Sequence, residues 1–224
     1  MNTISRVMAA VAFLMAANAN ASVLAYSEKG TFLAGTGATV ATTPYPNTGD
    51  TQHLGFVSGS VTLSAVQESS YTTGYLYFGA YTPRLPGNVI SINAFEDLDV
   101  AFAASVYAFG FDFVKPKFDP NIGAPFTDST FTVTLRQGAT DVGSFTFNPL
   151  ITDQAIFVGA SSSLAFNNVQ IRETISGVDD EFFGQFYTAA AAPIAAPIPE
   201  PGTWALSLLG LSAVGVMHRR RRQR

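Results

Sequence analysis

Apolar residues alternate with small or polar ones along several short segments of this chain. In the segment SVYAFGFDFV, aromatic residues occupy every second position, namely Tyr107, Phe109, Phe111 and Phe113. Successive side chains of a β-strand point to opposite faces, so this spacing places all four rings on one face. The spacing therefore predicts a strand whose aromatic face lies in a hydrophobic core.

The same period of two recurs in other segments, which are separated by turn signals rich in Gly, Pro and Asn. In FTVTLR, for example, Phe131, Val133 and Leu135 alternate with Thr and Arg. Further candidate strands are GSFTFNP, NNVQIRE, TGYLYFGAY, NVISINAF, QAIFVGA and EFFGQFY. No stretch between Ser22 and Thr188 keeps a helical period. We therefore expect an all-β domain over residues 22–188, an antiparallel β-sandwich, with a closed barrel as the alternative.

The N-terminal segment MNTISRVMAAVAFLMAANANA has the three parts of a secretory signal peptide. Arg6 gives a basic start, residues 7–17 form a short apolar stretch, and Ala19-Asn20-Ala21 matches the small-x-small cleavage pattern. The alternative is a buried N-terminal helix. We expect signal peptidase to remove residues 1–21, so that the mature protein begins near Ser22.

The C-terminal end combines a linker, an apolar run and a basic cluster. Residues 189–198 are rich in Ala and Pro, a composition typical of a semi-rigid spacer. The run from Thr203 to Met217 has no polar face and would span about 22 Å as a helix, against a bilayer core of about 30 Å. Arginines that follow such a span stay cytoplasmic, so we expect the β-domain to lie outside the inner membrane. The basic cluster is Arg219, Arg220, Arg221 and Arg222.

Pro199, Glu200, Pro201 and Gly202 directly precede the apolar run, and the arginines follow it. This order of parts resembles the PEP-CTERM sorting signal. The resemblance implies a protein exported by a Gram-negative bacterium that makes extracellular polysaccharide. It also implies that exosortase, a transpeptidase-like membrane enzyme, processes the tail at 199–224. Each Pro fixes φ and lacks an N–H donor, so the tripeptide should stay extended and accessible.

The body is similar to domains that often precede such tails. The shared order is the AFGFDF strand, a VTLRQG hairpin, the segment IFVGASSSLAFNNVQI and a late acidic turn, VDDE. Those domains resemble jelly-roll modules that bind carbohydrate. The similarity implies a jelly-roll-like sandwich that binds exopolysaccharide, as in a biofilm matrix.

The charge of the body argues against nucleic acid as a partner. Six basic and fifteen acidic residues lie between Ser22 and Ile198, a formal charge of about −9, and such a surface repels phosphate. The chain has no Cys, which excludes a disulfide framework, a thiolate zinc site and a cysteine nucleophile.

The sequence lacks the residue patterns that catalysis needs. His53 and His218 are its two histidines, too few for a common zinc site, and neither a Gly-x-Ser-x-Gly elbow nor a P-loop occurs. We therefore expect no enzymatic activity and no cofactor. The alternative is a secreted hydrolase acting on polysaccharide, which would need two carboxylates at a set separation. Candidates for that pair are Glu96, Asp97, Asp99, Asp179, Asp180 and Glu181.

Two clusters are candidates for binding. Asp179, Asp180 and Glu181 form an acidic turn that is either solvated or a calcium site with hard oxygen ligands. Tyrosine is an amphipathic ring that stacks on sugars, so the tyrosines of YTTGYLYFGAY form either a sugar platform or the core face of a strand. They are Tyr71, Tyr75, Tyr77 and Tyr81. The sequence thus predicts a non-catalytic exported protein, anchored as a precursor in the inner membrane and then released to the cell surface or the extracellular matrix.

Overall fold

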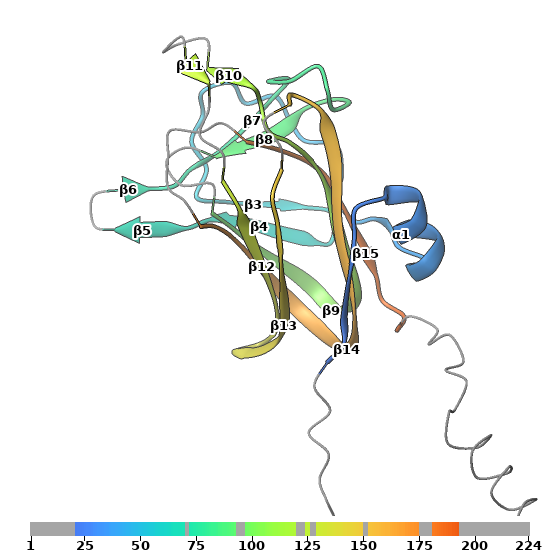
Figure 1. Ribbon diagram of the computed structural model, residues 1–224. Helices are drawn as coiled ribbons and strands as arrows, with labels where there is room; N and C mark the ends of the chain where they lie inside the picture. The colour runs from blue at the N-terminus through green and yellow to red at the C-terminus, as the bar shows by residue number, and fades with distance from the viewer. Residues whose placement is uncertain are drawn as a thin grey trace, which may run out of the picture. The chain divides into compact units, whose positions relative to one another are not determined.

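The computed structural model describes residues 21–69, 72–92, 97–119, 124–125, 129–149, 152–174 and 181–192 (Figure 1). Within these ranges the chain is an antiparallel β fold with a single α-helix, which confirms the all-β prediction. The helix is α1 (Lys29–Thr36). The longer strands are β1 (Val23–Tyr26), β3 (Gly55–Ser58), β4 (Val61–Ala65), β7 (Leu76–Gly79), β8 (Val89–Ile92), β9 (Leu98–Val114), β12 (Phe131–Gln137), β13 (Thr140–Phe147), β14 (Ala155–Glu173) and β15 (Phe182–Ala189). Shorter pieces are β2 (Thr39–Val40), β5 (Gln67–Ser69), β6 (Thr72–Thr73), β10 (Phe118–Asp119) and β11 (Ala124–Pro125).

Two long strands, β9 and β14, pass through both layers of a β-sandwich. They pair with each other over residues 98–101 and 168–171, and again over 108–114 and 155–161, with irregular register between. The first layer runs β3-β4-β9-β14-β12-β13 and uses residues 98–102 of β9. The second runs β7-β8-β15-β9-β14-β1 and uses residues 108–114 of β9. Strands that switch layers through bulges are the known way of turning such a corner.

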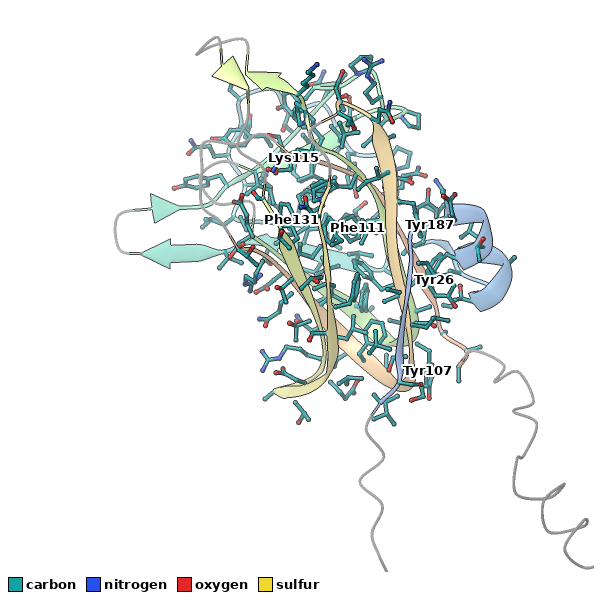
Figure 2. All side chains as sticks on the ribbon, in the orientation of Figure 1. Tyr26, Tyr107, Phe111, Lys115, Phe131 and Tyr187 are labelled. Atoms are coloured by element: carbon teal, nitrogen blue, oxygen red, sulfur yellow. The ribbon has the colours of Figure 1, made fainter. Side chains whose placement is uncertain are left out.

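The core lies between the two layers and is dominated by phenylalanine. Phe109, Phe111 and Phe113 of β9 are fully buried, and the ring of Phe113 lies 5.5 Å from that of Phe131 in the other layer. Figure 2 shows Phe111 and Phe131 in this interior. The predicted aromatic face is therefore confirmed at these three positions of β9.

The prediction is wrong for Tyr107, which is only half-buried. Its neighbour Val106 belongs to the core instead and pairs with Phe166 at the irregular register of the bend. An inserted residue at a bulge moves the core-facing position by one, so the alternation starts afresh after the bend. In β12, which has no bulge before Leu135, the predicted alternation holds and Val133 is fully buried.

One side of the sandwich is closed. His53 precedes β3 and forms a bridge with Leu76 of β7, with N···O distances of 3.1 and 2.7 Å. Because β9 pairs with both β4 and β15, this bridge completes a circuit through both layers. The rings of Phe56 and Phe78 lie 4.5 Å apart inside it. The fold is therefore a sandwich that is closed on this one side, as a barrel would be.

The helix α1 is an element that the sequence pattern does not predict. The helix lies on the outer face of the second layer, beside β14 (Figure 1). Its fully buried Phe32 packs against Phe157 and Tyr187, and Gly37 ends it with φ 67°. One fully buried apolar residue in eight gives no helical period. Packing against the sheet therefore determines that this segment is helical.

In the described part of the chain, no helix has the length and apolar character needed to cross a bilayer. The predicted signal peptide and the predicted apolar helix at 203–217 lie outside the described residues.

Candidate functional site

The predicted acidic turn divides between described and undescribed residues. Asp179 and Asp180 lie outside the described part. Glu181 is fully buried and pairs with Lys115, whose Nζ lies 3.0 Å from its Oε1, and both side chains are inaccessible to solvent. Glu181 is thus held in an internal ion pair, not on a solvated turn. The calcium site stays a prediction, and the described residues contain no cluster of three or more metal-ligating side chains.

The Lys115–Glu181 pair belongs to a larger polar network, which we call the end network. Lys115 Nζ donates to Ser129 Oγ at 3.2 Å, and Ser129 Oγ donates to Glu173. The backbone N–H of Glu173 donates to Asp97 Oδ1 at 2.8 Å. Two more ion pairs extend it, from Arg172 to Asp97 at 3.5 Å and from Arg172 to Asp99 at 2.5 Å.

The end network joins strand ends that are far apart in the sequence. Asp97 immediately precedes β9 and Lys115 immediately follows it, yet three hydrogen bonds connect them. This is the geometry of a strand folded back at its middle. Of the predicted hydrolase candidates, Asp97, Asp99 and Glu181 are engaged here, whereas Glu96 lies outside the described residues. The arrangement is that of a structural ion-pair network.

Tyr77 of the predicted tyrosine cluster lies on the outer face of the second layer. In β7 the core positions are Leu76 and Phe78, both fully buried, so Tyr77 points to the other face. Of the two alternatives for these tyrosines, the core face is therefore excluded at Tyr77, because its neighbours Leu76 and Phe78 occupy the core positions. Tyr71 lies outside the described residues, and Tyr75 is half-buried before β7.

A cross-strand row extends this face. Tyr77 lies opposite Ser91 of β8, and Ser91 lies opposite Phe182 of β15. Tyr81, just after β7, stacks beside Phe182 with ring centroids 6.0 Å apart and an interplanar angle of 19°. We call Tyr77, Ser91, Phe182 and Tyr81 the aromatic platform.

Tyr81 is held firmly in this platform although 40% of its surface is exposed. A Cβ added to Gly79 would lie 2.9 Å from Cζ of the ring, so the ring lies directly over a position that has no side chain. The Tyr81 hydroxyl donates to the carbonyl of Gly49 at 3.0 Å. Burial, and then the nearby charge of Asp50, raises the pKa of this hydroxyl, so it stays a neutral donor at physiological pH.

A groove of about 580 Å³ opens on the side of the sandwich away from the His53 bridge. Val23 of β1 lies close to Gly143 of β13, and later residues of both strands line the groove. The walls and floor are formed by Tyr26, Glu28, Phe145, Phe147, Asn148, Gln154 and Ile156, among others. The volume is in the usual range for a small-molecule site. Sequence reasoning missed it because β1 and β13 meet only through the fold.

His53 has a structural role in the described chain. Its ring packs 5.4 Å from that of Phe78 and 6.2 Å from that of Phe56, at the closed side of the sandwich. Lys29 likewise holds α1 on the sheet, through an ion pair with Asp112 at 2.9 Å and a contact over the Tyr187 ring. Burial lowers the pKa of Lys29, but the contacts with Tyr187 and Asp112 outweigh it and leave that pKa above its ordinary value.

Residues 197–222 match the family model described as the PEP-CTERM protein-sorting motif. The chain carries a PEP-CTERM motif. The match confirms the resemblance drawn from the Pro-Glu-Pro tripeptide, the apolar run and the arginines, and it marks this chain as an exported, sorted protein. The motif residues Pro199, Glu200, Pro201 and Gly202 lie outside the described part, as does the basic cluster that begins at Arg219.

The solved structures similar to this chain include carbohydrate-binding modules. Two are variants of a family 29 module, 10% and 12% identical to this PEP-CTERM protein, each with a TM-score of 0.34. They cover 72% and 73% of this chain and 98% and 97% of their own. A third is the C-terminal family 22 module of Clostridium thermocellum Xyn10B, with 14% identity, a TM-score of 0.26 and coverage of 67% and 100%. No curated protein matches the chain.

Proposed function

We propose that this chain is a non-catalytic surface or extracellular-matrix protein that is delivered and processed through its C-terminal tail. The observation that carries the proposal is the PEP-CTERM motif at residues 197–222. Signal peptidase first removes residues 1–21. The apolar run from Trp204 to Met217 and the arginines then hold the precursor in the inner membrane, with the β-domain outside.

In this proposal exosortase acts on the extended Pro199-Glu200-Pro201 tripeptide next to the membrane. Strand β15 ends at Ala189, and in the sequence an Ala/Pro segment lies between it and the tripeptide. Processing releases the jelly-roll-like sandwich from its anchor. The domain then works outside the cell as a binding module for polysaccharide.

A binding role is supported by how the ionisable groups of the domain are used. Buried Glu181 pairs with buried Lys115 and buried Asp97 pairs with Arg172, so these groups connect strand ends. The aromatic platform instead lies on the outer face of the second layer, with 40% of Tyr81 exposed. Such a surface suits a ligand that is bound and not converted. If the protein releases reducing sugars from neutral polysaccharides, that result would favour the hydrolase alternative.

The test of delivery is cell fractionation in a host that carries the matching exosortase. We expect wild type to reach the outside at its mature mass, and Glu200→Ala and Pro201→Ala to stay in the inner membrane at the precursor mass. Glu28→Ala is the matched control, because Glu28 is exposed and its side chain makes no capping bond to α1. If both tail variants are released as efficiently as Glu28→Ala, the tail is not a processing signal and the proposal fails.

A further inference from the structure

We propose that the aromatic platform of Tyr77, Ser91, Phe182 and Tyr81 is the binding site for a neutral polysaccharide chain. The proposal rests on the proposed function, since delivery outside the cell is what brings the domain to such a ligand. A sugar ring stacks on the exposed part of Tyr81, and neighbouring sugars follow the row of residues across the sheet.

The shape of the platform suits an extended chain of rings. Tyr77 and Phe182 lie in one row, two strands apart, which is about 10 Å at the usual strand spacing. Ser91 between them is short, so an aromatic side chain stands at each end of the row, and Phe182 is anchored there on Leu85, Val89 and Val114. Tyr81 stacks beside Phe182 and widens the aromatic surface there.

The chemistry of the platform suits sugars better than a purely apolar partner. A pyranose has an apolar C–H face and a rim of hydroxyl groups, and tyrosine offers a matching flat ring with a polar end. Polar side chains border the rings: Gln52 Nε2 donates to the Tyr77 hydroxyl at 3.0 Å, and the charge of Asp50 acts on Tyr81. Gln52 and Asp50 are both exposed and have capacity for further hydrogen bonds to sugar hydroxyls.

Charge selects a neutral ligand over an acidic one. Asp50 stands beside Tyr81, and the mature body from Ser22 to Ile198 carries six basic against fifteen acidic residues. A polymer of uronic acids would be repelled by this field. The ligand class is therefore a neutral hexose or pentose polymer.

The platform is organised before any ligand arrives. Gly79 leaves space for the Tyr81 ring, Phe182 supports it from the side, and the hydrogen bond to the Gly49 carbonyl fixes its polar end. A rigid aromatic side chain loses little conformational entropy on binding, so a modest contact area suffices.

Isothermal titration calorimetry of the purified full-length protein tests the proposal, with cellohexaose, xylohexaose and mannohexaose as probes and a galacturonate hexamer as the acidic control. We expect at least one neutral probe to bind and the acidic probe not to bind. Tyr81→Ala should weaken binding by about tenfold or more, whereas Tyr81→Phe, which keeps the ring, should stay within about threefold of wild type.

Two further variants separate the platform from other causes. Tyr77→Ala should also weaken binding, and it replaces Tyr81→Ala as the deciding variant if circular dichroism shows that the latter does not fold. Gln154→Ala, in the groove on the open side, should bind as wild type does. Failure of all neutral probes, preference for galacturonate, or loss of binding in Gln154→Ala but not in the folded platform variants would each overturn the proposal. Delivery is read separately by fractionation, so correct delivery without binding would refute the platform alone.

Discussion

The buried Lys115–Glu181 ion pair gives the sharpest test of how the two layers are held together. Its atoms lie 3.0 Å apart, and neither side chain is accessible to solvent. At an effective dielectric constant of about 20, two unit charges at this distance attract by about 5 kcal/mol. Each ion loses several kcal/mol of hydration on burial, so the net contribution of the intact pair is small.

Breaking the pair on one side should therefore be far more costly than replacing both residues. We expect Glu181→Leu to destabilise the domain by about 3–5 kcal/mol, because the buried ammonium of Lys115 loses the carboxylate that lies 3.0 Å from it. The double variant Lys115→Met with Glu181→Leu should lie within about 1–2 kcal/mol of wild type. Against a typical total of about 5–15 kcal/mol, the single variant loses a large share of its stability.

The measurement is urea unfolding followed by far-UV circular dichroism on wild type, both single variants and the double variant. Arg136→Met is the matched control, since its ion pair with Asp141 at 2.8 Å is on the surface and should contribute less than about 1 kcal/mol. If Glu181→Leu costs no more than this control, or if the two single costs simply add in the double variant, the pair is not coupled and the reasoning is refuted.

Three other outcomes follow from the structure and the sequence. Phe111→Ala should destabilise by about 3–5 kcal/mol in the same urea assay, because its fully buried ring contacts those of Phe183 and Phe186 at 5.7 Å; Tyr107→Ala, at the half-buried position, should cost clearly less, and equal costs would contradict the assignment of the core face. Truncation after Ala192 should shift the melting temperature by no more than a degree or two, since β15 ends at Ala189, and a large shift would show that the tail stabilises the domain. N-terminal sequencing of exported protein should begin within a few residues of Ser22, whereas an intact Met1 on exported protein would disprove cleavage behind Ala21.

The period of two in the sequence predicts which face of a strand is buried, but not which strand lies beside it. It correctly assigns Phe131, Val133 and Leu135 to the core, because that strand is regular up to Leu135. The same period cannot locate the bend in β9, where Val106 replaces Tyr107 at the core-facing position. A bulge depends on the neighbouring strand as much as on the local residues, so its position cannot be predicted from the sequence of one segment.

The candidate sites show the same division between local and distant information. The sorting tail could be recognised from the sequence because all its parts are consecutive, from Pro199 to Arg222. The end network could not, since Lys115 and Glu181 are 66 positions apart and Glu181 reads locally as one more acid in a turn. The sequence identifies the tyrosine cluster but leaves open whether its rings face the core or the solvent. The burial of Leu76 and Phe78 decides between these two faces.

The bend in β9 and β14 also explains why one polar network can hold the sandwich together at the end opposite to it. A straight strand of 17 residues would separate its ends by more than about 50 Å. Because β9 folds back, Asp97 and Lys115 instead meet through Ser129 and Glu173, and the two layers are joined both at the bend and at the end network. The side chains of the aromatic platform lie on the outer face of one layer and make none of these hydrogen bonds. We therefore expect substitutions at Tyr77 or Tyr81 to leave the buried pair and the phenylalanine core between the layers intact.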